Sequence, residues 1–409
     1  MTASSQNGYR RVVVTGLGVV SSLGIGWQEF WKNLIAGKSG ISRISSFDTS
    51  GYNRHYAGEI KNFDPSIFLS KQKIASTGRA SQLAIAAAKL AVRDADFDFD
   101  ILKVSKMAVC IGTTVGELRH LELFHDYIKS KSKVDKSEMI NAFPSNSLSA
   151  SIAREFGLRG WNSVMATACS AGNYAIGYTY EMIKHGKINF GLAGGSDSFS
   201  RVVFTGFSRL YSIAEERCQP FDKNRQGMIP AEGAGVLFLE SLDSAIKRSA
   251  PIYAEIIGYG LSCDGQHMTI PTCDAVIMSI KGSLESAGVQ SNAIDYISAH
   301  GTGTSENDKV ECAALENIFG SRLKKIPVSG IKSMLGHTMG AASAIEAIGC
   351  CLSIKTAKIP PTINFETFDP DCNIDCVPNK FASKKVCVAL NNAQAFGGNN
   401  SCLVIRKYA

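Results

Sequence analysis

Short apolar runs alternate with longer amphipathic stretches along the first part of the chain. The apolar runs predict strands at residues 11–16, 107–112, 161–168 and 188–194. Two alanine-rich or apolar stretches of helical length predict helices at residues 81–93 and 172–184. This alternation predicts an α/β fold in which helices cover a sheet.

A second series of the same kind begins near residue 252. Strands are predicted at residues 252–258, 294–299 and 326–330, and helices at residues 275–287, 308–319 and 340–354. The chain then ends in a predicted hairpin, whose strands at 385–390 and 401–406 flank the glycine turn Gly397-Gly398.

The two series resemble each other, which indicates an internal duplication. Residues 12–18 are similar to residues 254–260, and the strand, Cys169 and helix have a counterpart in the strand, Lys332/His337 and helix. We predict an N-terminal half at residues 1–250 and a C-terminal half at residues 251–409. A duplicated fold would bring corresponding strand ends together, so that Cys169 and His337 could meet. The lysine-rich stretch 129–137 predicts a surface loop.

Composition narrows the class of protein. The 409 residues are 45% hydrophobic, enough for a large core. Apolar runs stop well short of the ~20 residues of a membrane span. A net charge of +7 is modest and spread out, so it does not indicate nucleic acid but suits an acidic protein partner. Twelve cysteines without C-x-x-C pairs argue against a zinc site or disulfide framework and favour the cytoplasm.

Three separated segments carry complementary chemistry. They are residues 167–172 with a thiol, 300–304 with an imidazole, and 331–337 with an ammonium and a second imidazole. Each follows a predicted strand, and polar groups at strand ends are typical of sites in α/β folds. A cysteine taken alone is more often structural. Cys169 differs because it precedes a helix, whose macrodipole favours the thiolate and hence nucleophilic attack.

The glycines at residues 16–24 resemble part of a dinucleotide-binding loop. The spacing is not G-x-G-x-x-G, and serine and glycine interrupt the helix that should follow. We therefore do not predict a nucleotide site.

Taken together, the motifs of this chain resemble the β-ketoacyl-acyl-carrier-protein synthases, the decarboxylating condensing enzymes of the thiolase superfamily. The motifs lie at residues 11–18, 167–172, 220–223, 232–235, 300–304, 332–337, 360–364 and 396–398. The resemblance implies a thiolase-like duplicated fold of α-β-α-β-α layers. It also implies an acyltransferase in fatty-acid or polyketide biosynthesis.

The resemblance assigns catalytic roles to Cys169, His300, His337 and Lys332. Cys169 would take an acyl group from a thioester. The two imidazoles would donate to the enolate oxygen formed when a malonyl thioester loses CO₂, and such donors are typically worth ~3 kcal/mol each. Lys332 would lie beside the second histidine and tune the site. Glu311 and Glu346 match acidic positions near this lysine, although either could equally be a helix-surface carboxylate.

The family's substrate-binding positions also have matches. Thr302, Thr304 and Thr269 would contact the phosphopantetheine arm, Phe396 would gate the acyl pocket and Val115 would line it. No metal and no cofactor is implied, because the substrates ride on the phosphopantetheine of an acyl carrier protein. That carrier is the expected partner, together with a second copy of the chain or a ketosynthase-like chain-length subunit.

Four positions depart from the family pattern. Gln226 replaces an acidic residue and Ala231 a glycine, while Gln394 and Ala395 replace an aromatic and a flexible glycine before Phe396. These changes favour a specialised polyketide or polyene pathway over housekeeping fatty-acid synthesis. A buried amide needs a hydrogen-bond partner. We therefore expect Gln394 to have one in the protein, in a partner subunit or on the substrate.

Two other functions fit the same fold. A chain-length subunit of a ketosynthase heterodimer lacks the nucleophile, whereas this chain retains Cys169 together with Lys332 and both histidines. A non-decarboxylating thiolase-like acyltransferase would carry a histidine and a cysteine in place of the two histidines. The sequence leaves acyl chain length, pathway, and homodimer or heterodimer open.

Overall fold

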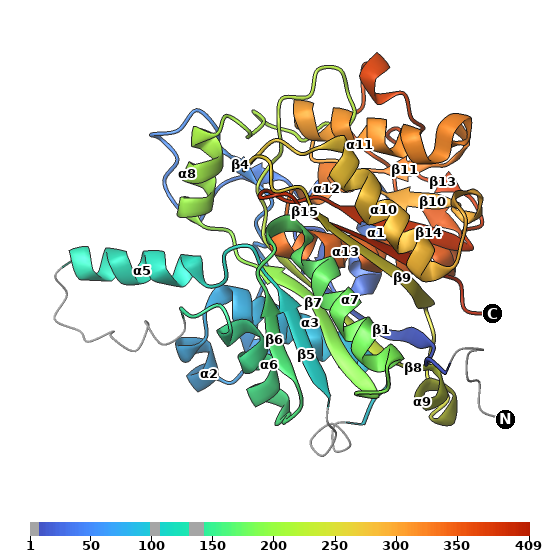
Figure 1. The fold of residues 1–409 in the computed structure, drawn as a ribbon. Coiled ribbons are helices and arrows are strands. Elements are labelled where there is room, and N and C mark those ends of the chain that lie inside the picture. The colour runs from blue at the N-terminus through green and yellow to red at the C-terminus, as the bar shows by residue number, and fades with distance from the viewer. Residues whose placement is uncertain (1–7, 99–106, 131–142) are drawn as a thin grey trace.

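A computed structural model describes residues 8–98, 107–130 and 143–409 and contains one large mixed sheet (Figure 1). The sheet has eleven strands in the order β11-β10-β14-β15-β9-β1-β8-β7-β5-β6, and the short β2 (Gly24–Ile25) pairs with β1. The strands of the first half are β1 (Val12–Ser21), β5 (Ala108–Gly112), β6 (Asn162–Met165), β7 (Phe190–Asp197) and β8 (Gly233–Ser241). Those of the second half are β9 (Ala254–Cys263), β10 (Tyr296–Ser298), β11 (Val328–Ser329), β14 (Val388–Ala393) and β15 (Asn399–Arg406).

The sheet confirms the duplication. Numbered along the chain within each half, the five strands have the same spatial order, third-second-fourth-fifth-first. In each half the second strand is parallel to the third and fourth, and the fifth is antiparallel to the fourth. The halves meet where β1 pairs antiparallel with β9, from Val12 opposite Ile256 to Val14 opposite Ala254. The boundary at residue 250 stays a prediction, which this symmetry supports.

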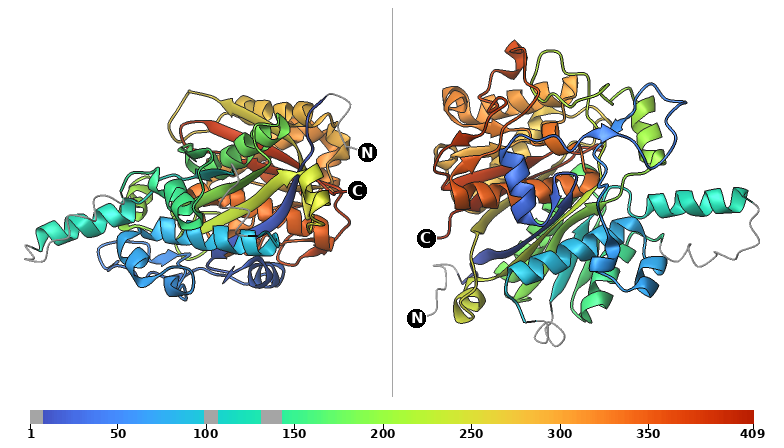
Figure 2. Two further views of the ribbon diagram at one scale, coloured as in Figure 1. Left: turned by 90° about the horizontal axis from the view of Figure 1, so that it is seen from below. Right: turned by 180° about the vertical axis from the view of Figure 1, so that it is seen from behind.

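Helices form layers around and between the two halves of the sheet. Helix α3 (Arg79–Asp94) packs on β1 and β8, and α10 (Cys273–Ala287) packs on β9 and β15. Helices α7 (Ala171–Lys184) and α13 (Ala342–Thr356) pack on each other and contact strands of both halves. Figure 2 shows α3, in blue, on the outer side of the first half. The expected α-β-α-β-α layering is therefore confirmed.

The glycines of β1 serve helix packing. A Cβ at Gly16 would lie 2.1 Å from the Ala91 carbonyl oxygen of α3, and one at Gly18 would lie 1.8 Å from that of Ala87. In the second half, a Cβ at Gly258 of β9 would lie 2.4 Å from the Ser283 carbonyl oxygen of α10, and one at Gly260 would lie 2.1 Å from that of Ser279. The resemblance between residues 12–18 and 254–260 thus reflects two equivalent helix-on-strand contacts, and the glycines lie within a strand rather than a nucleotide-binding loop.

Most predicted elements are present, with some differences in their bounds. The C-terminal hairpin is confirmed, with Ala393 opposite Ser401. β1 is longer than predicted, because it continues through a bulge between Val14 and Gly16. β6 is shorter than predicted, and β8 and several helices were not predicted. Lys129 ends helix α5, and most of the predicted loop 129–137 lies outside the described residues.

The remaining helices and short strands complete the fold. Their bounds are α1 (Trp27–Ile35), β3 (Ser42–Arg43), β4 (Tyr56–Ala57), α2 (Lys71–Ser76), α5 (Leu118–Lys129), α6 (Ser147–Phe156), α8 (Arg201–Arg209), α9 (Leu242–Lys247), α11 (Ser305–Phe319), α12 (Lys332–Leu335), β12 (Lys358–Ile359) and β13 (Ala382–Ser383). Within the described ranges, no helix is long and apolar enough to cross a membrane.

Candidate active site

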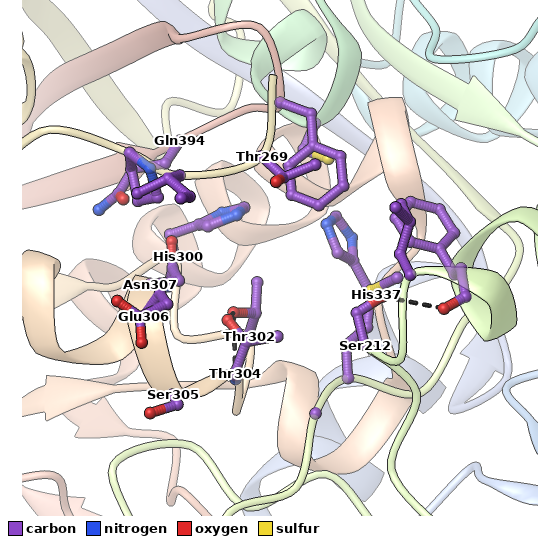
Figure 3. A pocket seen from close by; sticks show the side chains of 18 of the residues that line it. Ser212, Thr269, His300, Thr302, Thr304, Ser305, Glu306, Asn307, His337 and Gln394 are labelled. Carbon is purple, nitrogen blue, oxygen red and sulfur yellow. Dashed lines mark hydrogen bonds between the residues drawn. The ribbon is translucent and has the colours of Figure 1, made fainter. Parts of the chain in front are cut away.

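One pocket of about 320 Å³ collects the predicted chemistry from both halves of the chain (Figure 3). Cys169 from the first half and His300 and His337 from the second line it. The pocket is also lined by the predicted substrate-binding residues Thr269, Thr302, Thr304 and Phe396. Three of the residues that differ from the family pattern line it too, namely Gln226, Gln394 and Ala395. Residues distant in sequence thus share one cavity, as the duplication predicts.

Cys169 lies in the tight turn between β6 and α7. The turn, η3 (Ala168–Ser170), opens on Ala168 in the left-handed region at φ 49° and leads directly into α7. The second half repeats this design: η6 (Met339–Ala341) opens on Met339 at φ 53° and leads directly into α13. Gly340 is the second residue of η6, as Cys169 is of η3. The two halves therefore use the same turn, and only the first places a nucleophile in it.

The surroundings of Cys169 do not favour the thiolate that the sequence predicted. The Cys169 side chain is buried, and burial raises the pKa of its thiol to about 12. The charge of Lys332 and a backbone N–H of Phe396 lower this pKa, but burial outweighs them. The helix N-terminus is present as expected. A pKa raised this far favours the protonated thiol near neutral pH, so the proton must leave when the acyl group arrives.

Lys332 is enclosed by acceptors. Its ammonium Nζ donates to Glu346 Oε1 at 2.5 Å and to the His300 carbonyl oxygen at 2.6 Å, and it lies 3.3 Å from His300 Nδ1. Only 1% of the lysine is exposed. Lys332 therefore contacts His300 directly rather than the second histidine, His337, although its charge lowers the pKa of both imidazoles.

Both predicted glutamates are buried, which excludes the helix-surface interpretation. Glu346 pairs with Lys332. Glu311 instead accepts the backbone N–H groups of His300 at 2.7 Å and Gly301 at 2.8 Å, and Asn392 Nδ2 at 2.6 Å. Burial raises the pKa of each carboxyl to about 7. Glu311 thus fixes the backbone that carries His300, while Glu346 pairs with Lys332.

The two imidazoles are neutral and share one tautomer. Their rings lie 5.5 Å apart at an interplanar angle of 83°. Burial and the charge of Lys332 hold the pKa of His300 and of His337 well below the usual 6.5. Lys332 faces Nδ1 of His300, and the Met339 backbone N–H donates to Nδ1 of His337 at 3.2 Å. Each ring therefore carries its proton on Nε2, the donor that an oxyanion needs.

Thr302 and Thr304 lie on the rim formed by the loop before α11. Their hydroxyl oxygens are 2.9 Å apart. Asp308, buried at the start of α11, accepts the backbone N–H groups of Thr302 at 3.1 Å and Gly303 at 3.2 Å. Figure 3 shows both threonines below His300. Their predicted contact with a phosphopantetheine arm remains a prediction.

Phe396 and Val115 occupy different surroundings. The Phe396 ring lies 5.7 Å from that of Phe207 and is 36% exposed at the pocket. Val115 does not line this pocket. It packs in an apolar cluster with Met339, Met228 and Phe207, and Phe207 also lines the pocket. An acyl-binding role of Val115 would require the chain to extend past Phe207 into that cluster, and it stays a prediction.

Asp197 is an organising residue that the sequence reasoning missed. It is buried at the end of β7 and accepts the Thr113 hydroxyl at 2.5 Å, the Thr114 N–H at 2.7 Å and the Gly340 N–H at 2.7 Å. Burial raises its pKa to about 6. Asp197 thereby ties the loop after β5 to the turn η6. Its place three residues after the predicted strand 188–194 was the available signal.

Among the residues that the structure describes, no group of three or more His, Cys, Asp or Glu side chains is arranged to hold a metal ion. All twelve cysteines lie in the described part of the chain and are free.

Comparison with known proteins identifies the family. Residues 9–245 match the family described as "Beta-ketoacyl synthase, N-terminal domain", and residues 253–366 match "Beta-ketoacyl synthase, C-terminal domain". The chain belongs to the β-ketoacyl synthase family. It is therefore a condensing acyltransferase, as its motifs predicted.

The similarity to individual relatives extends over nearly the whole chain. A 3-oxoacyl-[acyl-carrier-protein] synthase 2 of Staphylococcus aureus is 35% identical over 413 residues, covering 99% of this β-ketoacyl synthase and 99% of the relative. The solved ishigamide ketosynthase/chain length factor is 42% identical with a TM-score of 0.95, covering 98% of this chain and 100% of that one. A type II polyketide-synthase acyl-carrier protein in complex with its ketosynthase bound to the hexaketide gives 33% identity, a TM-score of 0.90 and the same coverage.

Proposed function

We propose that this β-ketoacyl synthase joins an acyl group to a malonyl unit carried by an acyl carrier protein, releasing CO₂. The observation that carries the proposal is the shared pocket, which Cys169 lines together with two neutral Nε2–H histidines. A nucleophile and a pair of oxyanion donors are the groups that the two half-reactions need.

In the first half-reaction, the Cys169 sulfur attacks the carbonyl of an acyl thioester. The carrier thiol leaves with the proton, and the acyl group stays on Cys169. The backbone N–H of Phe396, which reaches the Cys169 thiol, is placed to donate to the acyl oxygen. In this scheme the histidines are not needed for the transfer.

In the second half-reaction, a malonyl thioester loses CO₂. The electron pair of the broken bond passes to the thioester oxygen, where the Nε2–H groups of His300 and His337 stabilise it. The enolate carbon then attacks the acyl carbonyl, forms the new C–C bond and expels the Cys169 thiolate, which takes up a proton from water and returns to the thiol. The scheme uses groups of the substrates and of this chain, with no further cofactor.

The enzyme should act with two protein partners. Relatives are named for acyl-carrier-protein substrates, and one solved neighbour is a carrier bound to its ketosynthase. Two neighbours pair a ketosynthase with a chain length factor. We propose that this chain is the catalytic half of such a pair, because a subunit that only sets chain length has no use for Cys169. The 42% identity to the ishigamide protein also favours a specialised pathway over housekeeping fatty-acid synthesis.

The cytoplasm is the proposed location. It supplies carrier-bound thioesters, and its reducing conditions suit twelve unpaired cysteines, one of them the nucleophile.

The test is reconstitution with an acyl carrier and a malonyl carrier. The wild type should release CO₂ and form a β-ketoacyl carrier two carbons longer than the acyl donor. Cys169→Ala should form none. Cys387→Ala, which changes an exposed cysteine, should leave product formation unchanged. Product from Cys169→Ala at the wild-type rate would refute the proposal.

A further inference from the structure

Gln394 is a buried amide without a partner. Only 2% of the residue is exposed, and neither Nε2 nor Oε1 has a hydrogen-bond partner among the described residues. Leaving such a group unpaired typically costs ~1–3 kcal/mol. The other buried side-chain amides of the described chain, at residues 173, 219, 307, 391, 392 and 400, all donate at least one hydrogen bond. Gln394 is therefore an exception that calls for a ligand.

The position of Gln394 indicates which part of a ligand it meets. It lines the pocket that also holds Cys169 and His300, and Figure 3 labels Gln394 and His300 in this pocket. His300 Nε2–H is the proposed donor to the thioester oxygen of the malonyl unit. The other polar group of that unit is its carboxylate, which lies on the far side of a single methylene carbon. A polar side chain that lines the same pocket as His300 can thus meet the carboxylate.

The cations of the site are already engaged. Lys332 donates to Glu346 and to the His300 carbonyl, and Arg225, which also lines the pocket, is paired with Asp369 at 2.5 Å. A malonyl carboxylate entering the pocket loses water and needs a donor. The Gln394 Nε2–H₂ group is an unused neutral donor there, and Oε1 remains free to accept from a water.

We propose that Gln394 is a positioning residue that holds the malonyl carboxylate by a hydrogen bond from its side-chain amide. This inference rests on the proposed function and adds a recognition element for the extender unit. The bond is strongest to the full negative charge before decarboxylation and weakens as neutral CO₂ leaves. It therefore contributes to binding and orientation more than to the rate of the chemical step.

The experiment compares Gln394→Met and Gln394→Glu with the wild type in two assays. The first measures malonyl-carrier decarboxylation, and the second measures transfer of an acyl group to Cys169, which involves no malonyl unit. Gln394→Met removes the donor at similar volume and should raise KM for the malonyl carrier about 10-fold, with kcat changed less than about 2-fold. Gln394→Glu should raise KM further, through like-charge repulsion, and the increase should shrink as the pH falls and the new carboxyl protonates.

Controls separate this role from structural effects. Acyl transfer to Cys169 should stay within about 2-fold of wild type in both variants. Gln72→Met, at an exposed glutamine of helix α2 that does not line the pocket, should leave the malonyl KM unchanged. The melting temperature of Gln394→Met should equal or exceed that of wild type, because an unpaired amide is replaced by an apolar group.

Three results would overturn the assignment. They are an unchanged malonyl KM in both variants, an equal loss in both assays, and a lowered melting temperature of Gln394→Met. A wild type that takes up acyl groups but decarboxylates no malonyl carrier would instead refute the proposed function, and the assignment with it.

Discussion

A single buried ammonium acts on three groups of the site at once. The charge of Lys332 lowers the pKa of His300, of His337 and of Cys169. For the imidazoles it works with burial and keeps both neutral. For the thiol it opposes burial, and burial prevails. Lys332 therefore favours neutral oxyanion donors without making Cys169 a resting thiolate.

The histidines should divide their effects between the two half-reactions. His300→Ala or His337→Ala removes one Nε2–H donor, and we expect malonyl decarboxylation to slow ~10²-fold or more. Acyl transfer to Cys169 should be affected less, because backbone N–H groups serve that step. Separate assays of CO₂ release and of acyl-enzyme formation measure the split. An equal loss in both assays for both variants would rule it out.

Lys332 should determine the pH below which the rate of decarboxylation falls. In the wild type the histidines stay neutral to well below pH 6.5. Lys332→Met removes a nearby positive charge, so the pKa of each histidine rises toward 6.5, and the rate should begin to fall at a higher pH. Loss of Lys332 also favours the protonated form of Glu346, which removes a negative charge near the histidines. This second effect offsets the first only in part, because burial already raises the pKa of Glu346 to about 7.

The measurement is the pH profile of CO₂ release between about pH 5 and 8. Lys332→Arg, which retains the charge, is the matched comparison and should keep the wild-type limit. A Lys332→Met profile that overlays the wild type would show that burial alone controls the histidines.

At the residue scale, motifs were sufficient to predict that Cys169, His300 and His337 share one pocket and that Lys332 lies beside a histidine of that pocket. The sequence could not give the histidine tautomers, since these depend on the Met339 N–H and on a lysine brought in from another segment. The resemblance placed Glu311 near Lys332 but did not show that the Glu311 carboxylate accepts the backbone N–H group of His300. Such contacts are set by tertiary packing and leave no local pattern.

At the scale of elements, two close-packed helices set the geometry of the nucleophile. A Cβ on Gly172, in the first turn of α7, would lie 2.7 Å from the Ala344 nitrogen and 2.8 Å from Ser343 Oγ of α13. The same Ser343 hydroxyl accepts the Asn173 N–H at 2.9 Å. The turn that holds Cys169 is thereby fixed against the helix that follows His337.

Gly172→Ala should therefore separate the two helices and misplace the nucleophile. We expect acyl transfer to Cys169 to slow at least ~10²-fold, the typical cost of a displacement of about 1 Å at a reacting centre. Rates of acyl-enzyme formation measure the effect. Gly282→Ala on α10 is the control, since its added Cβ meets nothing nearer than 3.8 Å. Equal rates in both variants would show that the close contact does not position Cys169.

Periodicity was a good guide to the elements with strong patterns and a poor one elsewhere. The long helices α3, α7, α10 and α13 and the C-terminal hairpin were predicted. β8 was missed although it lies near the centre of the sheet, because its start, Gly233-Ala234-Gly235, lacks the side chains that mark a strand. Those small residues are required there: a Cβ on Gly235 would lie 2.9 Å from the Ile345 nitrogen of α13.

At the scale of the whole molecule, the two halves share one core. A single cluster includes Val12 and Ile176 of the first half and Ile256 and Ile348 of the second. The sheet also continues across the halves through β1 and β9. The proposed boundary near residue 250 thus separates repeats of the sequence rather than units that can fold alone.

We therefore expect one cooperative unfolding transition for the chain. Ile348→Ala, in the shared core, should lower the free energy of unfolding by ~3 kcal/mol and shift that whole transition. Ile246→Ala, at an exposed position of α9, should change it by less than ~0.5 kcal/mol. Calorimetry measures both. Two separate transitions, with only one shifted by Ile348→Ala, would contradict a shared core.

The role of Cys169 can be tested most directly by intact-protein mass spectrometry in two steps. Incubation with an acyl carrier should add one acyl mass to the chain, and peptide mapping should place it on Cys169. Addition of a malonyl carrier should then remove that mass while a β-ketoacyl carrier, longer by two carbons, appears. An acyl group mapped to another cysteine, or one that stays on Cys169 through the malonyl step, would contradict the assignment of Cys169 as the condensing nucleophile.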